Sequence, residues 1–201
     1  MSKNEERAAV METSKLVIRQ APSLTDHKDE GIAIAREMGI PVWEGRAEVR
    51  KFSGDSVDDA DLYEIVQGTP NLLVYGGASA LWHRVIGGST VPAFSNANAY
   101  IGVGDGATAA ANTQTGLIGT TNTAYLPMDA TYPLHTDGTT SGSATVQFRA
   151  TAATGTANFA WNEWAVFNSN SSGRMLQRKV ESLGTKTSAS TWQLLVSLTL
   201  S

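Results

Sequence analysis

The sequence predicts a mainly β protein: a C-terminal antiparallel β-sandwich, jelly-roll-like, preceded by a helix and by a charged, partly helical N-terminal arm. Apolar and polar residues alternate with period two in several segments after residue 99, and turn-forming residues separate these segments. Charged residues occupy 23 of the first 66 positions but only 11 of the remaining 135. We therefore divide the chain into an arm, residues 1–66, and a sandwich domain, residues 67–201.

The arm is expected to combine helices with one extended segment. Residues 5–20 and 26–38 mix apolar and charged side chains at roughly helical spacing, and Gly39 ends the second segment. Residues 42–52 can be extended, with Trp43 and Phe52 as apolar anchors. Residues 56–66 resemble a short acidic helix that begins at a capping pattern.

Residues 70–86 are predicted as a helix that leads into the sandwich domain. Pro70 suits a first helical turn, several large apolar residues can form one side, and Gly87 ends the segment. Gly76 and Gly77 each cost about 1 kcal/mol relative to Ala inside a helix. A close packing contact at these glycines, for instance with a second copy of the chain, would make that cost tolerable.

The sandwich is expected to contain strands at residues 100–103, 144–150, 159–167, 175–183 and 192–200. In the third strand, alternation places Phe159, Trp161, Glu163, Ala165 and Phe167 on one face, with Asn162 and Trp164 on the other. We expect the first face to fill the interior. A buried Glu163 carboxylate then needs donors, such as backbone N–H groups, Arg149 or Arg178.

Composition excludes several classes of function. A net charge of −4 argues against nucleic acid as the main partner. No apolar run is long enough to span a membrane, and the absence of cysteine rules out disulfides and thiolate metal sites. The three histidines lack metal-ligand spacing, and Gly102–Gly106 lacks the context of a phosphate loop, so we expect neither a metal nor a cofactor.

The low charge of residues 67–201 is the main indication of function, because isolated proteins usually keep a charged surface. Such an exterior is expected to be covered in an assembly. Two alternatives are a glycan hydrolase that uses Glu163 with Asp129 or Asp137, and a sugar-binding platform at Trp161 or Trp164. We favour a structural role over an enzyme, since the sequence offers Glu163 no clear second acid for a glycosidase pair.

Four blocks of the sequence resemble small virion proteins of tailed bacteriophages. The blocks are Asn96–Gly106, Tyr125–Pro133, Asn158–Asn168 and Leu183–Ser201, and the resemblance extends over about residues 70–201. The Asn162–Phe167 element is also similar to a strand of tail-collar and receptor-binding fibre domains. The resemblance implies a structural β domain of the virion, commonly trimeric, with no catalytic residues to carry over.

Two positions in the particle are compatible with this resemblance. In the first, the chain is a decoration or minor capsid protein on the head, a homotrimer bound to the major capsid protein or other virion proteins through its arm. In the second, it is a tail-fibre, collar or baseplate component that contacts a host receptor or glycan. We favour the head, because a charged arm with little core of its own would order best against a large partner surface.

The residues expected to have structural or interface roles are Trp82, Tyr100, Trp161, Asn162, Glu163, Trp164, Phe167 and Trp192. A trimer could pack the helices at residues 70–86, or the faces of its sheets, around a three-fold axis.

Overall fold

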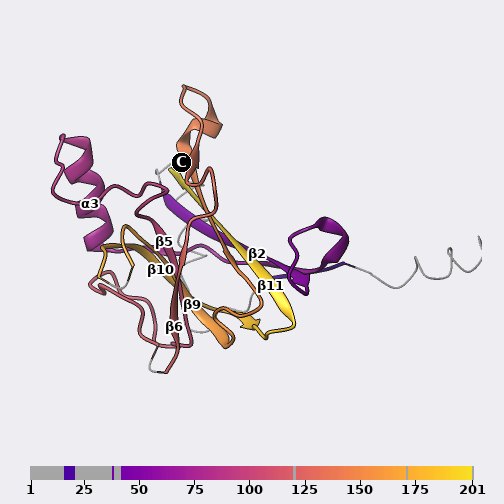
Figure 1. The fold of residues 1–201 in the computed structure, drawn as a ribbon. Coiled ribbons are helices and arrows are strands. Elements are labelled where there is room, and N and C mark those ends of the chain that lie inside the picture. Colours follow the sequence, from indigo (N-terminus) through magenta and orange to yellow (C-terminus); the bar gives the residue numbers. More distant parts are fainter. Residues whose placement is uncertain (1–15, 21–37, 39–41, 120, 171, 201) are drawn as a thin grey trace, which may run out of the picture.

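The computed structural model describes residues 16–20, 38, 42–119, 121–170 and 172–200, which form two packed β-sheets (Figure 1). The six-stranded sheet has the order β1 (Val17–Gln20), β3 (Leu62–Gln67), β2 (Trp43–Ser53), β11 (Ser190–Leu200), β8 (Thr145–Ala152) and β7 (Leu134–His135). The five-stranded sheet has the order β4 (Leu72–Leu73), β10 (Met175–Thr185), β9 (Ala160–Phe167), β5 (Tyr100–Gly104) and β6 (Thr123–Pro127).

Helical structure is a minor part of the described chain. It comprises α3 (Tyr75–Val85) and the short 3₁₀ turns η1 (Asp59–Asp61) and η2 (Ser141–Ala144). The strands pair antiparallel except for β1 and β3, which are parallel. The predicted antiparallel sandwich is confirmed, and a jelly-roll arrangement of its strands stays a prediction.

The strands β2 and β11 pair along their full length, from Ser53 opposite Ser190 to Trp43 opposite Leu200, without a shift in register. On their other sides, β2 pairs with β3 and β11 pairs with β8. Residues 43–67 therefore belong to the sandwich, and the predicted boundary after residue 66 is wrong for this segment. Arg46, Glu48 and Arg50 alternate along β2 with Ala47 and Val49, which are buried in the core. Lys51 is buried as well, and its ammonium lies 4.1 Å from the centre of the Trp192 ring.

The helix predicted over residues 56–66 is also wrong. The single 3₁₀ turn η1 is followed by the strand β3, whose β-branched and aromatic residues favour pairing with β2. Of the helix predicted over residues 5–20, residues 17–20 form the strand β1. Residues 5–15 of that prediction, and residues 26–37 of the next one, lie outside the described part of the chain.

The interior of the sandwich is built from alternate residues of the facing strands. On β11, these are Trp192, Leu194, Val196 and Leu198, all buried in one core cluster. The rings of Trp161 and Trp192 meet edge to face with centroids 5.0 Å apart. Aromatic pairs of this geometry contribute roughly 0.5–1.5 kcal/mol beyond the area that they bury.

The faces of β9 differ from the predicted alternation. Trp161, Trp164 and Val166 all belong to the core between the sheets, whereas Ala165 and Phe167 pack in a smaller cluster with Val74 and Met175. The alternation changes phase because the pairing of β9 with β10 shifts register between Val180 and Gly184. The prediction that Phe167 and Glu163 fill the main interior is therefore wrong.

The helix α3 begins five residues later than predicted, because Leu72 and Leu73 pair with β10 as the edge strand β4. A close packing contact at the glycines is present, and it lies within one chain. A Cβ atom on Gly77 would stand 2.2 Å from the carbonyl oxygen of Leu176, whereas one on Gly76 would have no heavy atom closer than 3.9 Å. Gly77 thus allows α3 to lie against β10.

We expect Gly77→Ala to lower the free energy of unfolding by more than about 1 kcal/mol, because overpacking forces the helix away from β10. The matched control is Gly76→Ala, which should leave stability unchanged or raise it by up to about 1 kcal/mol, since this site has room for a methyl group. Urea unfolding of both variants measures the difference. Equal effects of the two substitutions would contradict the close approach at Gly77.

Folding shifts the pKa values of two glutamates in opposite directions. Glu181, buried between the sheets, accepts hydrogen bonds from the Trp164 indole (2.7 Å) and from the Thr69 amide (2.8 Å). Burial nevertheless raises the pKa of Glu181 above its ordinary 4.5. At Glu64, burial also favours the neutral acid, but the hydrogen bonds and charges of Lys51 and Arg19 outweigh it and lower the pKa.

These directions predict opposite pH dependences for two variants. The stabilising contribution of Glu181 decreases as the pH rises from about 4.5 through its raised pKa, whereas that of Glu64 is lost as the pH falls below about 4.5. The stability of wild type minus that of Glu181→Gln should therefore fall with increasing pH. The same difference for Glu64→Gln should rise, as measured by denaturant unfolding across pH 4.5, and slopes of one sign would refute the assignment.

Candidate functional site

One end of the sandwich carries two projections with a hollow between them. The helix α3 forms one projection, the segment 134–144 with β7 and η2 forms the other, and the C-terminal end of β11 lies nearby (Figure 1). A groove of about 480 Å³ is enclosed by these elements. We call it the apolar groove, because most of its lining residues are hydrophobic.

The lining of the apolar groove is drawn from segments far apart in the sequence. These are Ala78, Leu81, Trp82 and Val85 of α3, Trp43 and Leu73, Leu198 and Leu200 of β11, and the run from Ser143 to Val146 together with His135. None of the described residues that line it is an Asp, Glu, Lys or Arg. A groove of this size and apolar character is typical of a binding site.

The pairing of β2 with β11 forms the floor of the apolar groove. It sets Trp43 directly opposite Leu200, so the first residue of β2 and the last of β11 share one end of the sheet. The contact of Gly77 with Leu176 then holds α3 as one wall. The same interactions that close the sandwich therefore also shape the groove.

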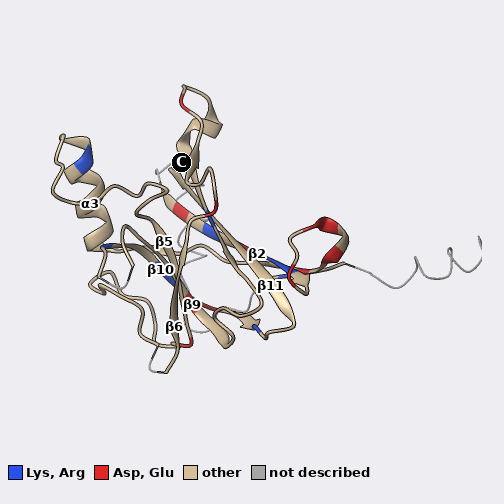
Figure 2. Ribbon diagram, in the orientation of Figure 1, with Lys and Arg blue, Asp and Glu red and all other residues tan. Residues whose placement is uncertain are grey.

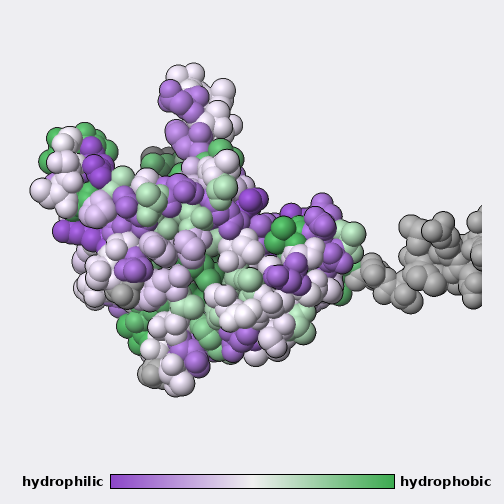
Figure 3. Space-filling view, in the orientation of Figure 1, coloured by the Kyte–Doolittle hydropathy of each residue, from purple (hydrophilic) through white to green (hydrophobic). Residues whose placement is uncertain are grey.

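The free side of α3 is strongly hydrophobic. Trp82, Val85 and Ile86 are 68%, 72% and 81% exposed, and we call these three residues the apolar ridge. Figure 3 shows hydrophobic residues over α3. Trp82 and Val85 also line the apolar groove, so ridge and groove form one continuous surface. Contiguous exposed apolar surface of this kind marks an interaction site more often than an isolated exposed side chain does.

Charged residues are sparse at this end of the molecule. Arg84 is the only charged residue between positions 70 and 98, and Asp137 is the only one between positions 130 and 148. In Figure 2, red and blue segments of the ribbon, which mark charged residues, are frequent along β2 and on the loop that follows it. Charged residues are therefore scarce in the segments that form the groove.

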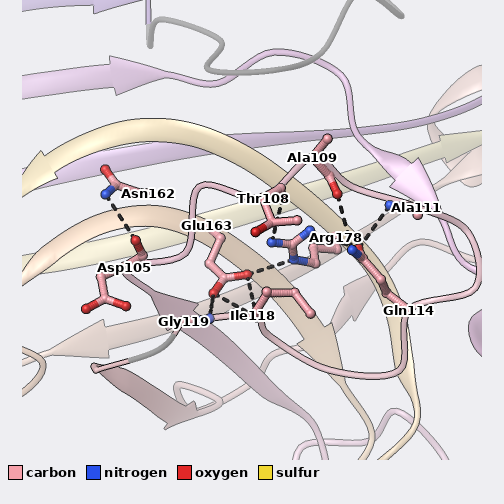
Figure 4. Close-up of polar contacts among 10 residues, drawn as sticks. All are labelled: Asp105, Thr108, Ala109, Ala111, Gln114, Ile118, Gly119, Asn162, Glu163 and Arg178. Atoms are coloured by element: carbon pink, nitrogen blue, oxygen red, sulfur yellow. Dashed lines mark hydrogen bonds and ion pairs between the residues drawn. The ribbon is translucent and has the colours of Figure 1, made fainter.

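A buried ion pair lies on the outer face of the five-stranded sheet. Glu163 of β9 and Arg178 of β10 are completely buried there, with 2.7 Å between the Arg178 Nε and Glu163 Oε2 atoms (Figure 4). The Glu163 carboxylate also accepts hydrogen bonds from the backbone amides of Ile118 (3.0 Å) and Gly119 (2.6 Å). The predicted donors, backbone N–H groups and Arg178, are confirmed.

The ion pair fixes the loop between residues 105 and 119. The Arg178 guanidinium donates to the Gln114 side chain at 2.8 Å and to the Thr108 carbonyl at 3.0 Å, and Gln114 in turn bonds Ala109 and Ala111 (Figure 4). A loop without regular structure is thereby attached at both ends of its span. We conclude that Glu163 and Arg178 hold this covering segment in place.

The buried position of Glu163 bears on the hydrolase alternative. The carboxylate is fully enclosed and already bound to Arg178, so a glycan cannot reach it in this conformation. Asp129 instead pairs with Arg149 of β8 at 2.9 Å, and Asp137 lies on the exposed segment 134–144. The structure therefore gives Glu163 neither Asp129 nor Asp137 as a facing carboxylate.

The sugar-platform alternative is contradicted by the position of its tryptophans. Trp161 and Trp164 are both fully buried, and their indole nitrogens donate to the Ala157 carbonyl and to Glu181. A buried ring cannot stack on a sugar. Both residues support the core.

The other residues singled out from the sequence take different positions. Trp192 is buried against Trp161, Phe167 packs edge to face on Tyr125, and Tyr100 is half-buried on β5. Asn162 donates a hydrogen bond to the Asp105 carbonyl at 3.3 Å. Trp82 is the one candidate that the structure places on an open surface.

Sequence reasoning missed the floor and the second wall of the apolar groove. Trp43, Leu200 and Ser143–Val146 gave no common signal, because nothing in the local pattern shows that these segments meet. The alternation of β11 continues to Leu200 and indicated only that one face of this strand stays apolar to its end.

The described histidines occupy structural positions. The His83 ring is 3.1 Å from the Thr90 hydroxyl, and the His135 ring is 3.1 Å from the Thr145 carbonyl oxygen. Within the described ranges, no three His, Asp or Glu side chains gather as a metal site. None of the helices described for this chain is long and apolar enough to cross a bilayer.

Comparisons of the chain with protein-family models, with curated proteins and with solved structures found no match.

The Glu163–Arg178 pair predicts a large effect of neutralising one partner. Glu163→Gln should lower the free energy of unfolding by about 3–5 kcal/mol, because it leaves the Arg178 charge buried without a counter-ion. The control is Asp59→Asn, which removes the exposed partner of Arg50 and should cost less than about 1 kcal/mol. Denaturant unfolding gives both values, and a loss at Glu163 as small as that at Asp59 would show that the pair does not stabilise the fold.

Proposed function

We propose that this chain is a structural protein of a tailed-bacteriophage virion, a decoration or minor capsid protein that binds and stabilises the head as a homotrimer. The observation that carries the proposal is the apolar end of the sandwich, where the ridge and the groove leave hydrophobic surface uncovered. Such a surface is suited to permanent contacts rather than to catalysis. The proposed partners are other copies of the chain and the major capsid protein.

The blocks that resemble virion proteins support the proposal through their positions. Three of them include β5, the last three residues of β6, and β9, which are neighbouring strands of the five-stranded sheet. Most residues of these three blocks thus share one sheet, whose outer face also carries the Glu163–Arg178 pair, whereas the fourth block contains β11 of the six-stranded sheet. A resemblance scattered over unrelated loops would have been weaker support.

The segment that we propose as the anchor is shorter than residues 1–66. Because β2 and β3 are strands of the six-stranded sheet, the arm is reduced to residues 1–41, of which residues 17–20 pair with β3 as the edge strand β1. Thirteen of these 41 residues are charged. We propose that this charged segment contacts the neighbouring virion protein, while the sandwich supplies the contacts between copies.

In the tail-fibre, collar or baseplate alternative, the chain would contact a host receptor or glycan. Trp161 and Trp164 are buried and offer no sugar platform for such a contact, and we keep the head as the preferred location. The similarity of residues 162–167 to a strand of tail-collar domains keeps the tail as the second candidate.

The proposal is tested on gradient-purified particles of the phage that encodes the chain. Mass spectrometry should find the chain in many copies per particle, and immunogold labelling should place it on the heads. Label confined to the tails would replace the capsid assignment by the tail alternative. Absence of the chain from intact particles, with all of it free in the lysate, would refute a virion function.

A further inference from the structure

We propose that the apolar groove is the docking site for the apolar ridge of a second copy of this chain. This inference deepens the homo-oligomer of the proposed function by naming the surface through which copies meet. It rests on the proposed function only for self-association, and does not require that the chain be part of a phage.

The first argument is the extent of the exposed surface. A small molecule seated in the groove would cover the groove side of Trp82 and Val85. It would leave Ile86, which is 81% exposed, and Tyr75, which is 64% exposed, in water at the same end of the molecule. Only an occupant with a surface of its own can cover the groove and the ridge together.

The second argument is the area that is available. An aromatic side chain contributes roughly 150–250 Å² when it becomes fully buried. Trp82 and Tyr75 are 68% and 64% exposed in a single chain, so most of this area is available to a partner. Together with the aliphatic residues Val85, Ile86 and Leu200 and the groove walls, they approach the scale of about 800 Å² per partner that a stable specific interface buries. The apolar end is therefore large enough for a lasting contact between copies.

The third argument is charge. The groove wall on α3 carries Arg84, and the wall formed by residues 134–144 carries Asp137; both residues are exposed. When the ridge of one copy enters the groove of another, none of the residues that line the groove is charged, and the wall formed by residues 134–144 offers Asp137 as an unlike charge to the entering Arg84. A second copy can therefore occupy the groove without burying a charge of its lining.

The test compares two Val→Lys substitutions in the full-length chain. Val85 lies on the ridge, whereas Val57, which is 49% exposed, belongs to the loop between β2 and β3. This loop and α3 lie at opposite sides of the sandwich in Figure 1. We expect wild type and Val57→Lys to sediment as the same multiple of 21.3 kDa. Val85→Lys should weaken association at least about tenfold, because the contact would bury an unpaired ammonium. Circular dichroism verifies that both variants are folded.

The outcomes separate this inference from the proposed function. Wild type that stays monomeric at all concentrations, or Val85→Lys that associates like Val57→Lys, would overturn the docking of ridge in groove. A dimer or a trimer that Val85→Lys disrupts supports it. Presence in particles is a separate result, so a chain that associates through this face but is missing from virions would refute only the virion assignment.

Discussion

The pairing of β2 with β11 is the interaction on which the rest of the structure depends. Its continuous register from Ser53–Ser190 to Trp43–Leu200 places the two strands at the middle of the six-stranded sheet. On one face, the ladder supplies inward residues to the core around Trp161 and Trp192. At its end, it supplies the floor of the apolar groove. The pairing of β2 with β11 therefore contributes both to the core of the fold and to the exposed hydrophobic groove.

The outer face of the five-stranded sheet is organised by a different principle. There, a buried charge pair takes the place of apolar packing and secures a loop whose sequence has little preference for any regular structure. Buried ion pairs gain little over well-packed hydrophobic residues, but they require one geometry. We infer that Glu163 and Arg178 are used to specify the position of the loop, while the stability of the sandwich comes from its core.

The sequence predicted the parts of the fold that depend on local alternation and missed those that depend on neighbours. The bounds of the strands β5, β8, β9, β10 and β11 agree closely with the predicted ones, and β8 and β11 keep the period-two alternation of their core residues. The strand β3 was taken for a helix, because its acidic lead-in resembles a cap, and only its pairing with β2 makes it a strand. The faces of β9 change at a register shift with β10, which its own residues do not encode. The need of Glu163 for a cation could be predicted from electrostatics alone, whereas the apolar groove could not, because it exists only where four distant segments meet.

The exposed state of Trp82 depends on whether another copy of the chain covers the apolar end of the sandwich, as we propose. Trp82 reports on this contact directly, since Trp161, Trp164 and Trp192 are buried and Trp43 is partly so. Quenching of tryptophan fluorescence by acrylamide, with Trp82→Phe as the background, measures the access of solvent to this ring. If a second copy covers this ring, acrylamide should quench Trp82 weakly at high protein concentration and markedly more on dilution. Strong quenching of Trp82 that does not change with concentration would contradict this contact.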